Sequence, residues 1–509
     1  MNGTRRAAAL LSAVLCMGAC TADLLPAAAN DPSEWMTVTG DVNGDGSFTV
    51  SDIVALQKWL LAVPDAHPAN PAAGDLDADG TLDVYDLALM KRLLLNPVPP
   101  EPQEPEDPGT PIASSLKSFT RSLPTTGDVR MLSVFVDFAD AKYRGNMYSN
   151  EQLREELFGN NTALYPYESL TAWFDRASYG NLHLDGDVYR YTCSGNLSDY
   201  MSAERQEPGY ERMVTEVLAG LDGQINFADY DSDQDGVIDC ISFTVPLDDA
   251  DEATKKYWRG CTSTWFVNPE FTVDGESIVK YIILDEMPYQ DQMVSVKRTL
   301  AHEMGHCMGL PDYYKYNDDD WEGLCGIAGN ERMDDSVGDF CSFSKLMCGW
   351  LKDTEVQAYD GSGTQTFTLE DASRTGSCLI LPISSAPTDY TSEYFLVEYV
   401  SDTGNNSENF YGTSGVRIFH VQSELYTDAW WRTRFRYENY AETYLGNDKI
   451  RVLRLVNDNG DFYHTGDTVT YGTTNFAGYD ANGYQTVNTG YTITIGELTD
   501  AGYTVTVSR

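Results

Sequence analysis

Residues 298–316 read RTLAHEMGHCMGLPDYYKY and contain two of the six histidines of this 509-residue chain. His302 and His306 are four residues apart, so on a helix both imidazoles project from one face and can reach one point. Glu303 follows the first histidine directly. Two imidazoles on one helical turn with a carboxylate beside them are typical of a zinc site in which the glutamate contacts water and not the metal. The stretch therefore predicts a helix that carries a metal centre.

The motif continues as HExxHxxGxxD, which extends the prediction beyond the helix. Gly309 can adopt a positive φ, which ends the helix and turns the chain back. Asp312 then follows as a third ligand. A catalytic zinc needs three protein ligands and one open position for water. We therefore expect one zinc ion held by His302, His306 and Asp312, with Glu303 as the base that takes a proton from water.

The overall composition excludes several classes of partner. The formal net charge of −44 argues against binding to nucleic acid or to an anionic membrane surface. Residues 1–29 combine a basic start with a short apolar run, which predicts a signal peptide and an exported protein. Cleavage after Ala22, cleavage after Ala29 and lipidation of Cys20 are alternatives. No later stretch is long enough to span a membrane.

An internal repeat precedes the zinc motif by about two hundred residues. GDVNGDGSFTVSDIVALQKWLL begins at Gly40 and GDLDADGTLDVYDLALMKRLLL at Gly74, each an Asp-rich loop followed by an amphipathic helix. Alternate oxygen-bearing side chains on a loop turned by glycine are the ligands that calcium prefers. The two loops predict two calcium ions, and the expected ligands are Asp41, Asn43, Asp45, Ser47, Asp52, Asp75, Asp77, Asp79, Thr81 and Asp86.

A third acidic stretch, DSDQDGVID, occupies residues 231–239. It predicts one further calcium ion in the larger domain, and the expected ligands are Asp231, Asp233, Asp235 and Asp239. The twelfth position is Ser242, so the loop lacks its final carboxylate. A solvated acidic turn is the alternative interpretation.

Composition and patterning predict a multidomain chain. We expect a signal peptide at 1–29, an α-helical EF-hand-like domain at 36–97, a Pro/Glu-rich extended linker at 98–117, an α+β catalytic domain at 118–357 and an all-β, sandwich-like domain at 358–509. VRMLSVFVDFAD and SIVKYIILDEM are predicted strands, the second with a free edge for an extended substrate, and SLTAWFDRASYG is a predicted helix.

The repeats resemble a type I dockerin, because each loop ends in aspartate and leads into a leucine-bearing helix. The resemblance implies calcium-dependent folding and docking onto a cohesin module of a scaffoldin, as in cellulosomes. It also implies an extracellular, cell-surface or cellulosome-associated location. Val50, Ser51, Val84 and Tyr85 fall where dockerins carry partner specificity.

The extended zinc motif resembles the metzincin clan, in which a methionine-containing turn lies beneath the metal. Met333 in NERMDD is the candidate for that turn, with Met347 as the alternative. Asp312 replaces the histidine that most metzincins carry as third ligand. With LSVFVDFAD, SLTAWFDRASYGNLHLDG, NFADYDSDQDGVID, FSKLMCGWL and YFLVEY…GVRIFHV, the motif resembles the immune inhibitor A family of secreted zinc metallopeptidases. That resemblance implies a metzincin-like catalytic domain, a β-rich domain after it, and endopeptidase activity on proteins.

Two other classes of function remain open from the sequence. The chain could be a docking or adhesive component whose peptidase fold is inactive, although the motif retains all of His302, Glu303, His306 and Asp312. It could also be a glycan-binding component in which the aromatic stretch DAWWRTRFRYENY stacks on sugars.

Overall fold

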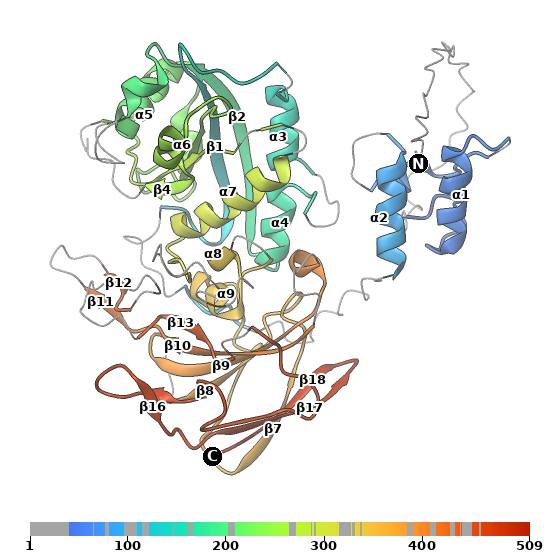
Figure 1. Cartoon of the computed structure of the whole chain (residues 1–509), viewed down its shortest axis with the longest axis vertical. Coiled ribbons are helices and arrows are strands. Elements are labelled where there is room, and N and C mark those ends of the chain that lie inside the picture. The colour runs from blue at the N-terminus through green and yellow to red at the C-terminus, as the bar shows by residue number, and fades with distance from the viewer. Residues whose placement is uncertain are drawn as a thin grey trace, which may run out of the picture.

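The computed structural model describes residues 40–64, 66–76, 81–95, 109–114, 122–145, 147–160, 166–201, 209–263, 271–286, 288–289, 292–314, 327, 331–335, 338–383, 390–407, 414–427, 433–437, 439, 450–457 and 460–509. The predicted signal peptide lies outside these residues. Within them, no helix is both long enough and apolar enough to cross a membrane. The described part of the chain has α and β content and several sheets (Figure 1).

The two repeats form a small helical unit around its own core. Helix α1 (Val50–Leu60) and helix α2 (Val84–Leu95) each follow an acidic loop, and a short turn, η1 (Pro71–Ala73), lies between them. The Thr49 side chain accepts a hydrogen bond from the Ser51 amide and caps the start of α1. The buried apolar residues of both repeats form one cluster, made of Val42, Ile53, Leu56, Leu76, Leu89 and Met90.

The larger α/β part is built on a five-stranded sheet. Its strands are β1 (Gly127–Asp137), β2 (Leu182–Thr192), β3 (Cys240–Thr244), β4 (Cys261–Ser263) and β5 (Tyr281–Leu284). The order is β2-β1-β3-β5-β4, and only β4 runs antiparallel. The prediction that the strand in SIVKYIILDEM offers a free edge was wrong, because the short strand β4 pairs with β5 and takes the outer position.

Helices cover both faces of this sheet. Side chains alternate along β1, so Met131 and Phe135 face one hydrophobic cluster while Leu132 and Val134 face another. The first cluster lies under α3 (Asn150–Phe158), α4 (Leu170–Ala177) and α7 (Met293–Cys307), and the second under α5 (Gly209–Leu221) (Figure 1). Helix α6 (Glu252–Trp258) and the turns η2 (Leu197–Tyr200) and η3 (Phe227–Tyr230) complete the second side.

The predicted helix in SLTAWFDRASYG ends earlier than its glycine. Helix α4 stops at Ala177 because the chain turns left-handed already at Tyr179, with φ of 55°, and continues so at Gly180, with φ of 75°. Two short helices, α8 (Arg332–Asp335) and α9 (Ser342–Cys348), follow the zinc motif along the chain.

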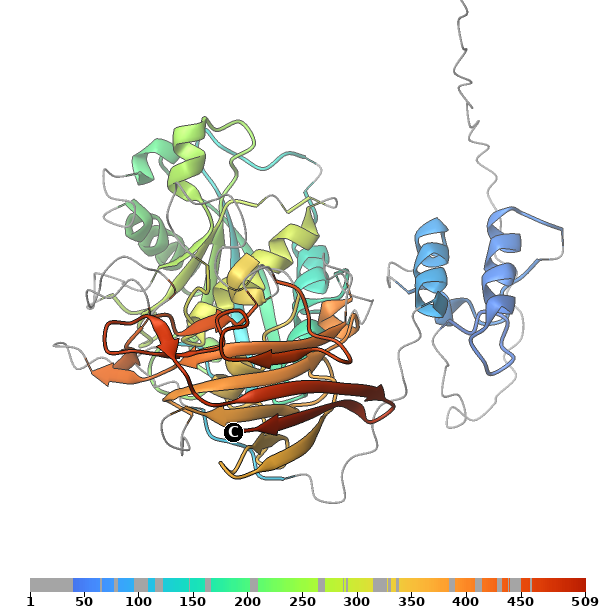
Figure 2. The same ribbon diagram turned by 60° about the horizontal axis from the view of Figure 1, so that its bottom comes forward.

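The C-terminal part is a two-layered β structure, as the patterning predicts (Figure 2). One sheet has the order β13-β10-β9-β8-β6 and contains β6 (Val356–Ala358), β8 (Cys378–Pro382), β9 (Glu393–Val400), β10 (Gly415–Gln422) and β13 (Leu453–Leu455). The other has the order β14-β17-β18-β7 and contains β7 (Thr364–Leu369), β14 (Thr468–Thr470), β17 (Thr492–Thr499) and β18 (Gly502–Ser508). Smaller elements are η4 (Gly404–Asn406), β11 (Leu425–Thr427), β12 (Thr433–Phe435), β15 (Gly478–Tyr479) and β16 (Gln485–Val487).

The five-stranded sheet of this part is buried on both faces. On β9, Phe395 and Val397 pack against the second β-sheet, whereas Tyr394 and Leu396 belong to the cluster that contains α7 and α9. One hydrophobic core therefore runs from the α/β part into the β-rich part. The predicted boundary at residue 357 marks a change in composition within that core.

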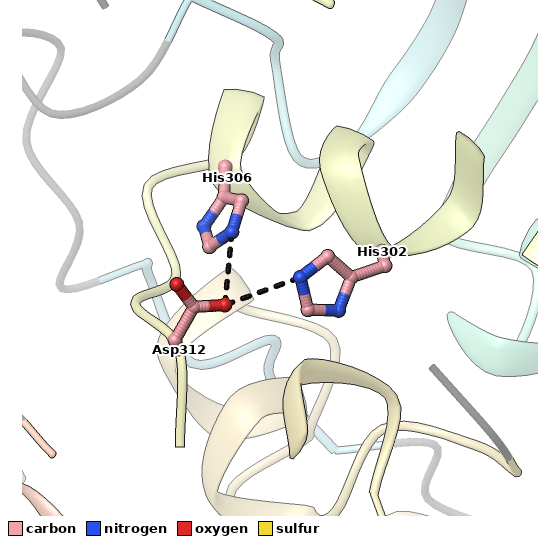
Figure 3. Close-up of side chains that lie close together, drawn as sticks. All are labelled: His302, His306 and Asp312. Atoms are coloured by element: carbon pink, nitrogen blue, oxygen red, sulfur yellow. Dashed lines mark ion pairs between the residues drawn. The ribbon is translucent and has the colours of Figure 1, made fainter. Parts of the chain in front are cut away.

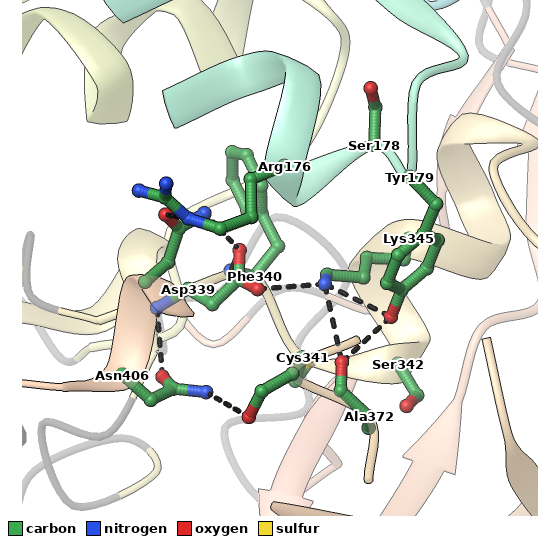
Figure 4. Close-up of polar contacts among 12 residues, drawn as sticks. Arg176, Ser178, Tyr179, Asp339, Phe340, Cys341, Ser342, Lys345, Ala372 and Asn406 are labelled. Atoms are coloured by element: carbon green, nitrogen blue, oxygen red, sulfur yellow. Dashed lines mark hydrogen bonds and ion pairs between the residues drawn. The ribbon is translucent and has the colours of Figure 1, made fainter. Parts of the chain in front are cut away.

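Buried polar contacts reinforce the same interface (Figure 4). Lys345 Nζ on α9 lies 2.7 Å from Asp339 Oδ2, and both side chains are almost fully buried. Lys345 Nζ also donates to the Tyr179 hydroxyl at 3.0 Å, and the amide of Asp339 donates to Asn406 Oδ1 at 3.0 Å. These bonds connect the end of α4, the start of α9 and the β-rich part.

The described end of the predicted linker lies against the larger part. The amide of Thr110 donates to Asp353 Oδ1 at 2.8 Å, and the amide of Ile112 donates to the carbonyl of Leu351 at 2.9 Å. Residues 109–114 are therefore not a free spacer, and residues 96–108 lie outside the described residues.

Candidate metal centre

Helix α7 ends in a turn that brings the third predicted ligand back toward the first two. Gly309 has φ of 98°, the positive value predicted from the motif. Its amide donates to the carbonyl of His306 at 3.0 Å, and the Leu310 amide donates to the carbonyl of Gly305 at 3.0 Å. These are the two bonds of a Schellman motif, which reverses the chain after a helix. The residues that follow therefore return along the face of α7.

His302, His306 and Asp312 converge on one point (Figure 3). The Nε2 atom of each imidazole lies 3.1 Å from Asp312 Oδ1. His302 is buried, and the side chains of His306 and Asp312 are mostly buried. The structure therefore brings together all three residues that the sequence predicts as zinc ligands.

Backbone carbonyls fix the orientation of both imidazoles. His302 Nδ1 lies 2.8 Å from the carbonyl oxygen of Arg332, and His306 Nδ1 lies 2.8 Å from that of Leu310. A carbonyl only accepts, so each Nδ1 carries a hydrogen, and each Nε2 is the ring nitrogen left to face Asp312. Such outer contacts are the usual support of metal-binding histidines.

The centre favours positive charge. Burial opposes ionisation of these groups, but the Asp312 carboxylate outweighs it and raises the pKa of His306 to about 9. In return, the two imidazoles hold the pKa of Asp312 well below its ordinary range despite burial. Two imidazole nitrogens and one carboxylate oxygen at one buried point are a donor set that suits zinc. The residues present therefore fit the predicted metal.

Glu303 is buried beside the three ligands and has a specific partner. Thr262 Oγ1, on the outer strand β4, lies 2.8 Å from Glu303 Oε2 and 2.9 Å from the Glu303 carbonyl oxygen. The single hydroxyl hydrogen can be donated to either of these oxygens, and donation to Oε2 restricts the rotamer of the carboxylate. Nothing in the sequence around Thr262 signals this contact.

Met333 packs directly against the zinc-motif helix. It is buried, and a Cβ added to Gly305 would overlap its Sδ. The Met333 carbonyl accepts a hydrogen bond from the Tyr313 amide at 2.9 Å, which fixes this segment beside the third ligand. Met347, the alternative methionine, is buried in α9. Met333 therefore lies against the helix that carries His302 and His306.

The first loop of the repeats wraps its backbone around the first aspartate. Asp41 accepts hydrogen bonds from three backbone amides, at 2.8, 3.1 and 2.8 Å. Asp52, at the twelfth position, accepts from the amides of Asn43 at 3.0 Å and Thr49 at 2.9 Å. Asn43, Asp45 and Asp52, the predicted ligands at positions three, five and twelve, are thereby held near Asp41. The amide of Ser47 donates to Asp45 Oδ1 at 3.0 Å.

The second loop is described only in part. Asp86 is buried and accepts from the amides of Leu76 and Asp83, both at 2.8 Å. Asp75 and Thr81 are described, whereas Asp77 and Asp79 lie outside the described residues.

The predicted partner-contact residues stand at the starts of the two helices. Val50 is 61% exposed and Val84 is 63% exposed, and Ser51 is exposed as well. Tyr85 is in α2, and its side chain lies outside the described part. Exposed apolar side chains at equivalent places in both repeats are available to a partner.

The third acidic loop brings several predicted ligands together. Asp231, Asp233 and Asp239 each place a carboxylate oxygen so that these atoms lie within 4.8 Å of one another. Asp235 lies in the same loop and accepts a hydrogen bond from the Val237 amide at 3.0 Å. This group and the histidine–aspartate centre are the two clusters of this kind among the described residues.

The family comparison matches the N-terminal unit of this chain. No curated protein matches the chain. One solved structure, catalytically inactive OgpA from Akkermansia muciniphila in complex with an O-glycopeptide (glycodrosocin), is 11% identical and covers 63% of this chain and 94% of that chain, with a TM-score of 0.23. A likeness at this level supports no conclusion about function. Residues 39–95 match the model of the dockerin type I domain, whose members bind calcium, so this segment of the chain is a dockerin type I domain.

Proposed function

We propose that this protein is a zinc-dependent endopeptidase of the metzincin type, resembling the immune inhibitor A family, that its dockerin tethers to a cohesin-bearing scaffold outside the cell. The observation that carries the proposal is the convergence of His302, His306 and Asp312, with two Nε2 atoms each 3.1 Å from one carboxylate oxygen. Glu303 is held in the same buried site by Thr262.

The chain's own residues have distinct roles in this proposal. His302, His306 and Asp312 would hold zinc, which when bound supplies a Lewis acid and lowers the pKa of water toward neutrality. Glu303 takes a proton from the attacking water and passes it to the leaving amine. Thr262 positions Glu303 by binding Oε2, so the carboxylate meets water in one orientation.

The outer strand β4 supports an extended polypeptide as the substrate. Among the described strands it is the antiparallel outermost one of the sheet, and its residue Thr262 contacts Glu303. A substrate that adds to this edge by backbone hydrogen bonds would pass the buried carboxylate. Strand addition recognises the peptide backbone, which suits a peptidase that acts within protein chains.

The dockerin supplies the location. A type I dockerin docks onto a cohesin module, and the exposed Val50 and Val84 at the starts of α1 and α2 offer the apolar contacts for it. The enzyme would thus work as an extracellular component of a cellulosome-like assembly. We expect its substrates to be proteins that present an accessible extended segment.

The test compares the full chain with Glu303→Gln, which keeps the size of the side chain but cannot take the proton. Zinc content and cleavage of an unfolded protein are measured for both. We expect one zinc per chain in each and cleavage by the parent alone. A parent that holds no zinc would overturn the metal centre. A parent that holds zinc but cuts no unfolded protein would favour a docking component with an inactive site.

A further inference from the structure

The acidic loop at 231–239 adopts the backbone arrangement of the first dockerin calcium loop. The amides four and five residues after Asp231 donate to its carboxylate at 3.0 and 2.9 Å. In the dockerin, the amides four and five residues after Asp41 donate at 3.1 and 2.8 Å. The turning glycines agree as well, since Gly236 has φ of 84° and Gly46 has φ of 88°. A loop of known calcium-binding type thus has a counterpart elsewhere in the same chain.

One carboxylate of the acidic loop at 231–239 has an oxygen without a hydrogen-bond partner. Asp239 is fully buried, and its Oδ2 accepts from the Ser232 amide at 2.8 Å, but its Oδ1 has no hydrogen-bond partner. A buried carboxylate oxygen without a donor is costly and needs an explanation. Because Asp239 lies in the cluster with Asp231 and Asp233, a cation at their centre would be the missing partner of this oxygen.

The residue at the twelfth position of this loop is not available to a cation. Ser242 lies in β3, where its hydroxyl is 3.0 Å from the hydroxyl of Ser133 inside the sheet. It therefore cannot act as the final ligand that an EF-type loop requires.

A carboxylate from another segment, that of Glu276, lies beside the loop. Ser277 donates both its amide and its hydroxyl to the carbonyl of Gly236, at 2.9 and 2.8 Å, which fixes the turn at 273–276 against the loop. Glu276 Oε2 is buried without a hydrogen-bond partner. Its carboxylate lies beside that of Asp231. Two facing carboxylates repel each other unless a cation lies between them.

We propose that Asp231, Asp233, Asp239 and Glu276 bind one calcium ion, which joins the acidic loop to the turn at 273–276. Four carboxylates and the loop backbone supply the oxygen ligands that calcium prefers. The loop leads directly into β3 and the turn leads toward β5, so the ion fastens two neighbouring strands of the central sheet. The site is independent of the proposed peptidase activity.

Calcium stoichiometry of the full chain tests the site. The chain is stripped with EGTA and dialysed against calcium, and bound calcium is counted by mass spectrometry. We expect three ions in the parent and one in a chain with Asp52→Ala and Asp86→Ala, because those changes disable the two dockerin loops. Asp239→Asn is expected to bind two, whereas Asp229→Asn, which removes an exposed carboxylate nearby, keeps three. Two ions in the parent would overturn the site.

Glu276→Gln tests the contribution of the separate segment. We expect it to weaken the third site at least tenfold while the dockerin sites keep their affinity. An unchanged affinity would remove Glu276 from the ligand set. If Asp239→Asn fails to fold, the parent's stoichiometry and the affinity of Glu276→Gln still decide the outcome.

Discussion

Replacing Thr262 by valine tests the link between the outer strand and the proposed catalytic base. Valine has nearly the same shape as threonine but cannot donate to Glu303 Oε2, which lies 2.8 Å from the hydroxyl. A hydrogen bond to a charged group contributes about 1.5–3 kcal/mol. Because each 1.4 kcal/mol is tenfold in rate, Thr262→Val should lower kcat by about 10- to 100-fold. The metal ligands are untouched, so zinc content should stay at one per chain.

The assay separates positioning from folding and from substrate binding. Steady-state cleavage of a fluorescence-quenched peptide gives kcat and KM for the parent, Thr262→Val and Thr262→Ser. Serine keeps the hydroxyl, so it should recover most of kcat, while KM changes little in either variant. A Thr262→Val enzyme with full zinc and kcat within twofold of the parent would refute the reasoning. Equal losses in Thr262→Ser and Thr262→Val would also refute it, because the hydroxyl would then not be the cause.

Three further predictions concern the support of the site. Gly305→Ala places a methyl group onto Met333 Sδ, so it should lower the free energy of unfolding by about 1–3 kcal/mol in urea denaturation. Adding Met333→Ala to the same chain should recover part of this loss. Lys345→Met leaves Asp339 buried without its cation and should cost about 3–5 kcal/mol in the same assay, with Asp339→Asn in addition recovering part of it. Burial outweighs three hydrogen bonds and raises the pKa of Glu331 to about 7, above its ordinary 4.5. Between these two values the folded chain binds more protons at Glu331 than the unfolded chain does. The free energy of unfolding therefore falls as the pH rises toward about 7. Glu331→Gln should therefore lose less unfolding free energy between pH 5 and pH 8 than the parent does.

The convergence of His302, His306 and Asp312 could be predicted from the sequence. The four-residue spacing of His302 and His306 defines a helical face whatever surrounds it, and Gly309 favours the positive φ that returns Asp312 to that face. The two dockerin loops were predictable for the same reason, because their ligands follow one another along a single short segment. Both predictions depend only on neighbours in the chain.

Contacts between distant segments could not be predicted. Thr262 lies in a three-residue strand with too few residues for an alternating pattern, and it is 41 positions away from Glu303. The same short strand explains why the free edge was assigned to the wrong strand, since nothing marks β4 as pairing with β5. Glu276 was missed because it lies outside the acidic loop that it faces.

The segment around Met333 connects the β-rich part to the site formed by His302, His306 and Asp312. Glu331 accepts hydrogen bonds from the amides of Met333 and Cys341, which fixes Met333 relative to the start of α9. The next amide, that of Ser342, donates at 2.7 Å to Glu398 on β9 of the five-stranded sheet. Polar contacts thus continue from the Met333 segment into the β-sandwich, along the same path as the shared apolar core. The sandwich therefore supports the segment beside α7, because one face of its five-stranded sheet packs in the same apolar cluster as that helix.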